Sequence, residues 1–234
     1  MRWLAKHKSV IDLADAVRQI DGTGRMAREA VALTFDDGFS GVYEHAFPVL
    51  RRLALPATVF LVTGTLTPEG RKVDWVDTPP PHPLGTLTRD EILEMQAAGI
   101  RFESHSHFHS DLVALHQEDC ENDLRTSREV LEALLGTAVA FLSYPRSRHN
   151  EGVREAAMRA GFTHAFAGER EAPKRLEFAG PPYAIPRVGV YPGNGSRALR
   201  MKSTRWYLPL RESGLYPLVR RLAGRGPLSH RRAG

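Results

Sequence analysis

The amino-acid sequence predicts an α/β fold built on a parallel sheet, and two observations carry this prediction. Six short apolar runs rich in β-branched and aromatic residues recur along the chain, as is typical of strands buried on both faces. Segments with helical spacing lie between several of these runs, which is the alternation of βα units. The length of 234 residues, of which 42% are hydrophobic, is enough for one sizeable core.

The expected elements follow in chain order. Strands are predicted at residues 30–35, 57–62, 99–105, 138–144, 164–167 and 184–190. Helices are predicted at residues 41–53, 87–99, 117–136 and 150–161. In the second of these helices Thr88 is placed to cap the first turn, Glu91 follows three residues later, and Gly99 ends the helix. The last two helices close on Gly136 and Gly161.

Basic residues are concentrated at the C-terminal end of the chain. Residues 197–234 contain ten Arg or Lys residues and a single acidic residue, Glu212, although the formal net charge of the whole chain is only +5. Aromatic and aliphatic side chains, beginning with Trp206, are interleaved with these arginines. The pattern suits peripheral contact with an anionic membrane surface, and the alternatives are a solvated tail or a segment that covers an edge of the fold. No nucleic-acid partner is expected.

Cysteine usage and the N-terminal residues bear on the cellular compartment. The only cysteine, Cys120, excludes an internal disulfide and is expected to be a small hydrophobe on a helix. The first twenty residues lack an apolar run of signal-peptide type and already include Asp12 and Asp15. A cytoplasmic location is therefore predicted, while the oligomeric state and the natural start of the chain stay open.

The stretch "ALTFDDG", residues 32–38, ends a predicted strand with two acids and a glycine. Adjacent side chains on an extended backbone point in opposite directions, so Asp36 and Asp37 are expected to do different work. One can ligate a metal ion while the other accepts a proton from water. The alternative is a turn in which the carboxylates only cap backbone N–H groups.

The stretch "ESHSHFHSDL", residues 103–112, places three histidines at alternate positions. An extended backbone would turn all three to one side, whereas a tight turn would bring together only residues four apart. His105 and His109 follow a predicted strand at the same sheet edge as the two acids. Two imidazoles and one carboxylate, with open positions for water and substrate, suit Zn²⁺ or a related divalent ion.

These two stretches resemble the first two motifs of the polysaccharide deacetylase, or NodB-homology, family. The first is "TFDDG", and the second is "SHSHFH", which fits the family pattern H-[S/T]-x-x-H. The resemblance covers residues 1–205, within the branch that acts in exopolysaccharide pathways, and leaves residues 206–234 as a basic tail. It implies a distorted (β/α) barrel of NodB type, with seven strands, and metal-dependent removal of acetyl groups from glycans.

The resemblance also implies roles for individual residues. Asp36 is expected to be the catalytic base, and Ser106 to stabilise the histidine turn by hydrogen bonding. The expected metal ligands are Asp37, His105 and His109. His107 is then expected to point elsewhere. Zn²⁺ is the favoured ion, with Co²⁺ and Ni²⁺ as alternatives.

The sequence departs from the family pattern at the third motif, R-x-P-[F/Y]. Here "FLSYPRS" puts Ser143 where the arginine would stand, while Tyr144 and Pro145 are kept. By resemblance, Tyr144, Pro145 and Arg146 are expected to contact substrate, with the N–H of Arg146 at the oxyanion position. Arg187, in "IPRVG", is the candidate for the missing charge that orients the base, and its alternative is a surface ion pair.

A second departure concerns the general acid. The family's "L-x-L-H" histidine has no counterpart in "AIPRVGVYPGNG", which leaves His149 and His164 as candidates, or else Asp36 and water. The predicted function is that of a metal-dependent deacetylase of N-acetylated glycans. Two alternatives are a hydrolase of a non-sugar C–N bond and a glycan-binding relative without catalysis.

Overall fold

A computed structural model of the chain describes residues 1–23, 25–66, 73–76, 84–168, 183–191, 194–204 and 206–213. The chain divides into two compact units, Met1–Arg187 and Val188–Gly234. The predicted division into a catalytic domain, 1–205, and a basic tail, 206–234, stays a prediction, because residues 214–234 lie outside the described part of the chain.

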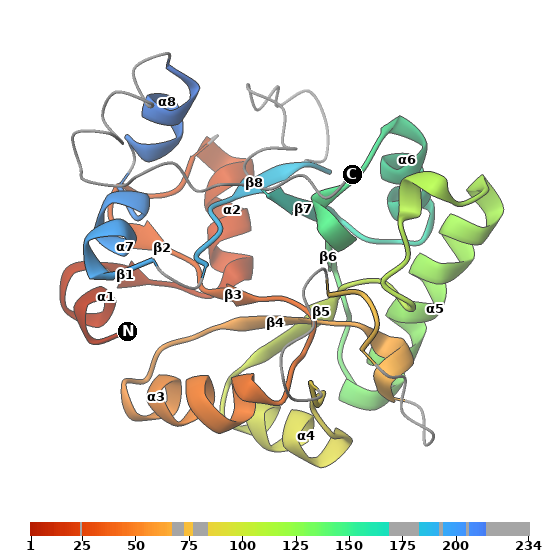
Figure 1. Ribbon diagram of the computed structural model, residues 1–234, viewed down its shortest axis with the longest axis horizontal. Coiled ribbons are helices and arrows are strands. Elements are labelled where there is room, and N and C mark those ends of the chain that lie inside the picture. Colours follow the sequence, from red (N-terminus) through yellow and green to blue (C-terminus); the bar gives the residue numbers. More distant parts are fainter. Residues whose placement is uncertain are drawn as a thin grey trace. The chain divides into compact units, whose positions relative to one another are not determined.

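A six-stranded parallel sheet forms the centre of the first unit. Its strands, in spatial order, are β3 (Thr34–Phe35), β4 (Thr58–Leu61), β5 (Arg101–Ser104), β6 (Phe141–Ser143), β7 (His164–Gly168) and β8 (Ile185–Arg187). Each strand pairs in parallel with the strand next to it along the chain. Figure 1 shows that the strands follow a curved path. The predicted α/β fold is therefore observed as a curled parallel sheet whose carboxyl ends share one edge.

The predicted strand at 30–35 is divided between two sheets. Residues Ala30–Val31 form β2, which pairs with β1 (Ser9–Val10) in a separate two-stranded sheet, whereas Thr34–Phe35 form β3 of the main sheet. The main sheet consequently has six strands within the described residues, and the expected seven strands are not confirmed. Strand β1 and the helices α1 (Arg2–His7) and α2 (Leu13–Thr23) are not among the elements predicted from the sequence.

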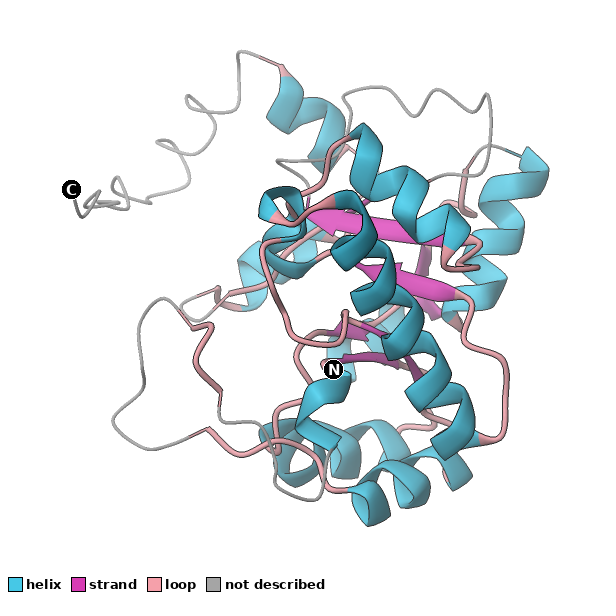
Figure 2. Cartoon of the chain, turned by 90° about the vertical axis from the view of Figure 1, so that its right-hand side faces the viewer, coloured by secondary structure: helices cyan, strands magenta, loops and turns pink. Residues whose placement is uncertain are grey.

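The predicted helices are all present. They are α3 (Phe47–Arg52), preceded by the π-helical turn η1 (Val42–Ala46), α4 (Arg89–Ala97), α5 (Gln117–Leu135) and α6 (Glu151–Arg159). They lie outside the curve of the strands in Figure 1, and Figure 2 shows helices covering the strands on the side that faces the viewer. Short 3₁₀ turns follow three strands, namely η2 (Thr63–Leu66), η3 (Leu112–Ala114) and η4 (Pro145–Ser147). The second unit contains α7 (Ser196–Lys202) and α8 (Tyr207–Glu212).

Helix α4 begins with the predicted capping box. The Thr88 hydroxyl accepts a hydrogen bond from the Glu91 N–H, and the Glu91 carboxylate accepts one from the Thr88 N–H. We expect Thr88→Ala to lower the free energy of unfolding by about 1 kcal/mol, since it leaves an N-terminal N–H without its partner. Urea unfolding measures this, with Thr88→Ser as the control that keeps the hydroxyl. Equal losses in both variants would contradict a role for the cap.

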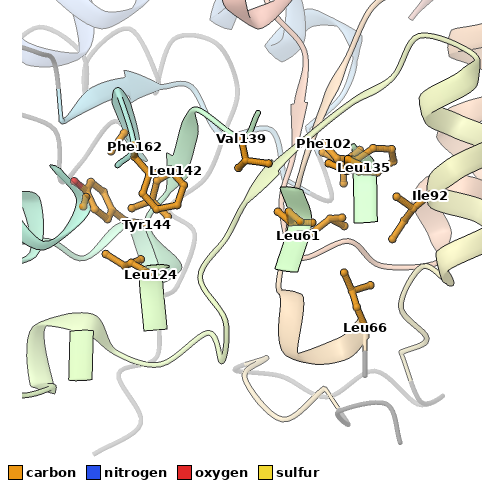
Figure 3. Packing of buried hydrophobic residues seen from close by; sticks show 14 of the residues in the cluster. Leu61, Leu66, Ile92, Phe102, Leu124, Leu135, Val139, Leu142, Tyr144 and Phe162 are labelled. Atoms are coloured by element: carbon orange, nitrogen blue, oxygen red, sulfur yellow. The ribbon is translucent and has the colours of Figure 1, made fainter. Parts of the chain in front are cut away.

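Two hydrophobic clusters use alternate residues of the same strands. In β4, Val59 and Leu61 belong to the larger cluster, whereas Phe60 between them belongs to the smaller one. The larger cluster contains helix residues such as Ile92 of α4 and Leu124 of α5, several of which are drawn in Figure 3. The smaller cluster includes Leu13, Val17 and Ile20 of α2 together with Phe141, Phe166 and Ile185. Helix α2 therefore packs on the opposite face of the sheet from α4 and α5.

A buried carboxylate pins the start of β6 against β5. Glu103 is fully buried in β5, and its Oε2 accepts hydrogen bonds from the backbone N–H groups of Ala140 at 2.9 Å and Phe141 at 2.8 Å. Burial raises the pKa of Glu103 to about 7. The backbone ladder between β5 and β6 pairs only Ser104 with Leu142. The Glu103 side chain therefore supplies acceptors for two β6-side N–H groups that the ladder does not pair. This contact helps to fix the position of β6 along β5, and with it the position of Ser143 at the end of β6.

Two further observations concern Cys120 and the apolar character of the described helices. Cys120 is buried on α5, as predicted. Among the described helices, none combines the length and the apolar character that a bilayer crossing requires.

Candidate active site

Most of the non-glycine residues with a left-handed backbone, within the described chain, follow the carboxyl ends of β3, β5 and β6. Six non-glycine residues of the described chain have positive φ, and all but Ala54 follow one of these three strands. The five are Asp37, Ser106, His109, Arg146 and Ser147, with φ between 54° and 68°. Such conformations cost about 1–3 kcal/mol each and persist where the surrounding structure enforces them, which is common at functional sites.

The turn after β3 sends the two acids to different partners. Asp37 has a φ of 68°, and Gly38 after it has the same φ and no room for a Cβ, which would collide with the Leu61 side chain. Asp36 faces Arg187, while Asp37 faces His105 and His109. The structure thus gives the paired carboxylates two separate environments.

Asp36 is held by a two-pronged ion pair. Arg187, the last residue of β8, donates from Nη1 to Oδ1 and from Nη2 to Oδ2, both at 2.8 Å. The same guanidinium donates to the Thr34 hydroxyl at 3.2 Å and to the Ser143 hydroxyl at 2.6 Å. Arg187 therefore contacts the carboxylate that it is predicted to orient, and the contact is not a surface ion pair, since the Arg187 side chain is only 17% exposed.

The charge state of Asp36 follows from these contacts. Burial alone would raise its pKa, but the positive charge and hydrogen bonds of Arg187, together with His105 and Ser143, outweigh burial and hold the pKa well below its usual range. Asp36 is consequently a carboxylate at neutral pH.

Asp37, His105 and His109 come together as a group that can hold a metal ion. Their ligand atoms all lie within 4.8 Å of one another. Oδ1 of Asp37 is 3.8 Å from Nε2 of His105 and 3.4 Å from Nε2 of His109. Both histidines are buried, and Asp37 is 23% exposed. One carboxylate and two imidazoles with a partly open side form the donor set of a catalytic zinc-type site.

The protonation of the two imidazoles supports this interpretation. Nδ1 of His105 must carry a proton, because it lies 2.7 Å from the Ser143 carbonyl, which can only accept. With that proton on Nδ1, Nε2 of His105 is the nitrogen that can offer a lone pair toward the Asp37 carboxylate. Burial lowers the pKa of His109 to about 3, so the His109 ring is neutral. Lone pairs that converge in this way repel one another unless a cation lies between them, so these residues fit a divalent metal.

The turn between the two histidines is stabilised as the sequence indicates. The Ser106 hydroxyl accepts a hydrogen bond from the His109 N–H at 2.9 Å. His107 does not join the group: its Nδ1 lies 2.7 Å from the Thr63 hydroxyl, and its N–H donates to the Asp123 carboxylate at 2.8 Å. The backbone is therefore a turn rather than an extended strand, which leaves residues 105 and 109 to share one side.

The predicted substrate contacts in "YPRS" need a correction. The Tyr144 side chain is only 1% exposed, packs with Leu124, Leu142 and Phe162 (Figure 3), and donates its hydroxyl to the Tyr183 carbonyl at 3.0 Å. Burial raises the pKa of the Tyr144 phenol far above its usual range. Pro145 is buried too. The side chains of both residues belong to the core, and only Arg146 of the three has an exposed side chain.

Neither histidine considered as a general acid has clear geometric support. His164 begins β7, at the amino edge of the sheet opposite the site, where it contacts Asp21 at 3.2 Å and Thr163 at 2.9 Å. His149 follows η4, and its ring stacks on Tyr144 with centroids 4.8 Å apart. The position of His164 on the wrong edge removes it as a candidate.

Trp75 is a site residue that the motifs do not reveal. Its indole N–H donates to Oδ1 of Asp37 at 2.8 Å, and its ring stacks on His109 with centroids 5.0 Å apart. It lies in a described segment of four residues, 73–76, without helical or strand periodicity. The only sequence signal is a lone tryptophan in the long connection after β4, too common a feature to support a prediction.

Comparisons with known proteins agree with this geometry. The family model for polysaccharide deacetylases matches residues 23–165. The chain is 27% identical over 199 residues to the YxkH protein of Bacillus subtilis, covering 85% of this chain and 65% of that protein. It is 25% identical over 199 residues to the poly-beta-1,6-N-acetyl-D-glucosamine N-deacetylase of Staphylococcus aureus, covering 80% of this chain and 63% of that protein. The chain thus spans less than two thirds of the length of either relative.

A solved structure extends the comparison to the fold. The deacetylase PplD of Streptococcus pyogenes, in complex with acetate, superposes with a TM-score of 0.70 at 19% sequence identity, over 86% of this chain and 82% of that one. This likeness confirms the fold seen here. Together with the match of the family model to more than half of the chain, it confirms the resemblance of the two motifs: the chain belongs to the polysaccharide deacetylase family.

Proposed function

We propose that this chain removes N-acetyl groups from an N-acetylated polysaccharide or glycoconjugate by hydrolysis, releasing acetate and leaving a free amine on the sugar. The observation that carries the proposal is the placement of three metal-ligating groups beside an arginine-held carboxylate at one sheet edge. The Staphylococcus aureus relative is named as an N-deacetylase of poly-beta-1,6-N-acetyl-D-glucosamine, which supports the substrate class.

The metal ion of this proposal is divalent, with Zn²⁺ favoured and Co²⁺ or Ni²⁺ as alternatives. Asp37, His105 and His109 would hold it. When bound, such an ion polarises the acetyl carbonyl and lowers the pKa of a nearby water molecule. The carbonyl of Ser143 supports this arrangement by fixing the ring of His105.

Asp36 is the proposed general base. Arg187 keeps its carboxylate ionised and fixes its orientation through two hydrogen bonds, so that it accepts the proton of the water that attacks the acetyl carbon. The backbone N–H of Arg146, in a left-handed turn, is the proposed donor to the carbonyl oxygen as negative charge develops there. The Arg146 side chain donates to the Trp75 carbonyl at 3.2 Å.

The deciding experiment measures acetate release from N-acetylglucosamine oligomers by purified protein. We expect turnover with Zn²⁺, loss of turnover after chelation, and recovery when Zn²⁺, Co²⁺ or Ni²⁺ is returned. Ring amides serve as the comparison substrate. Hydrolysis of ring amides without acetate release would favour the non-sugar hydrolase, and oligomer binding without turnover under every metal would favour a non-catalytic relative.

A charge-and-geometry series at Arg187 tests how the base is held. We expect Arg187→Met to lower kcat about 10- to 100-fold with little change in KM, because a misplaced catalytic group costs rate rather than binding. The kcat of Arg187→Lys should lie between those of the wild-type protein and Arg187→Met, since lysine keeps the charge and loses the planar guanidinium. Arg159→Met is the control: it removes ion pairs to Glu121 and Glu155 near the C-terminal end of α6, away from the site. An unchanged kcat in Arg187→Met would contradict the assignment.

A further inference from the structure

Trp75 contacts two of the three metal-ligating side chains at once. Its side chain is nearly buried, with the residue 7% exposed. The indole N–H donates to Oδ1 of Asp37 at 2.8 Å, and the indole ring lies over the His109 imidazole with an interplanar angle of 25°. No other described residue stacks face to face on either site histidine: the contact between His105 and His109 is edge-on, at 65°.

The hydrogen bond falls on the oxygen atom that faces both imidazoles. Oδ1 of Asp37 is the atom 3.4 Å from His109 Nε2 and 3.8 Å from His105 Nε2. Because Asp37 has a left-handed backbone, the pleat of β3 does not fix where its carboxylate points. A donor on Oδ1 fixes that direction.

The stacking contact fixes the second ligand. His109 Nδ1 is buried and has no hydrogen-bond partner within the described part of the chain, so hydrogen bonding does not hold the plane of this ring as the Ser143 carbonyl holds His105. The indole face instead holds the plane of the His109 ring by packing against it, with the two ring centroids 5.0 Å apart. The Trp75 carbonyl also accepts a hydrogen bond from Arg146, which ties the segment to the turn after β6.

We propose that Trp75 is a positioning residue of the metal centre, which orients the Asp37 carboxylate through its N–H and the His109 imidazole through its ring. The proposal rests on the proposed function for the identity of the ligands. It goes beyond the proposed function because it makes the metal affinity of the site depend on a tryptophan that lies outside the motifs.

The test compares metal affinity in two tryptophan variants. Trp75→Phe keeps an aromatic face and removes the N–H donor, and Trp3→Phe makes the same change where the ring stacks on His7, away from the site. Dissociation constants for Zn²⁺ are measured by competition with a chromophoric chelator. We expect affinity to fall about 10- to 100-fold in Trp75→Phe, as for other groups that hold metal ligands in place, and to stay at the wild-type value in Trp3→Phe.

A spectroscopic measurement keeps the proposal testable if Trp75→Phe folds poorly. The chain has three tryptophans, so Trp3→Phe combined with Trp206→Phe leaves Trp75 as the only one. We expect Co²⁺ to quench the fluorescence of this variant in proportion to site occupancy. Unquenched fluorescence at full occupancy would overturn the proposal, because Trp75 would then lie far from the ion.

The outcomes also separate this proposal from the proposed function. Wild-type affinity in a Trp75→Phe protein that melts at the wild-type temperature would overturn the role of Trp75 and leave the deacetylase intact. A wild-type protein that binds no divalent metal would instead overturn the metal centre itself. Weakened affinity together with an unchanged melting temperature of the metal-free protein supports the proposal.

Discussion

Asp36→Asn is expected to lower kcat by about 10²- to 10⁴-fold while metal content stays near the wild-type value. Asparagine keeps the size of the side chain and can still accept one of the two hydrogen bonds from Arg187, but it cannot take up a proton at neutral pH. The loss is that of a positioned general base. Acetate release from an N-acetylglucosamine oligomer gives the rate, and elemental analysis of the purified protein gives the metal content.

The matched comparison for this prediction is Asp37→Asn. Asp37 is the acid that lies with the two histidines, so its amide variant should lose metal as well as activity. The reverse pattern, with metal lost from Asp36→Asn and retained in Asp37→Asn, would exchange the roles of the two acids. Nearly wild-type turnover in Asp36→Asn would remove the general base from the mechanism.

The three histidines of the turn provide the second large effect. We expect His105→Ala and His109→Ala each to weaken Zn²⁺ binding by more than about 100-fold. Loss of a group that only supports a ligand already costs about 10- to 100-fold, and loss of a direct ligand should cost more. Dissociation constants are compared by chelator competition at one pH, because protons compete with metal for imidazole.

His107→Ala is a control built into the same turn. Its ring contacts Thr63 and Phe108 rather than Asp37, so its removal should leave Zn²⁺ affinity within a few-fold of the wild-type value. Equal losses in all three variants would mean that the turn opens and that the three imidazoles bind from an extended backbone. A loss confined to one of residues 105 and 109 would leave a site with only two protein ligands.

Much of the fold could be predicted because its signals are local. The capping pair Thr88 and Glu91 acts within one helical turn. The apolar runs at 57–62, 99–105, 138–144 and 164–167 overlap the observed strands β4 to β7. The strand at 30–35 was predicted as one element because its apolar run is continuous. Its division depends on which partner each half finds, β1 for Ala30–Val31 and β4 for Thr34–Phe35, and no local pattern encodes that choice.

The candidate site divides in the same way. The sequence predicts that two acids and two histidines lie together, because two short motifs lie at strand ends. These residues are Asp36, Asp37, His105 and His109. The burial of the Tyr144 side chain is not predictable from its motif, because a motif describes neighbours in sequence, whereas burial depends on packing against Phe162 and other distant residues. Trp75 was missed because its contact with Asp37 joins residues 38 positions apart through a segment without periodicity. Contacts of this kind are set by the tertiary fold.

The ion pair between Arg187 and Asp36 also joins the two ends of the sheet. β3 and β8 are its edge strands, and they are linked by side chains of residues 151 positions apart. Closing so long a stretch of chain carries an entropic cost that shorter-range contacts do not. During synthesis from the N-terminus, the residues of the metal centre emerge well before Arg187. In the proposed mechanism, competence for catalysis thus arrives with β8, and a nascent or clipped chain lacking β8 would retain the proposed ligands but not the orientation of the proposed base.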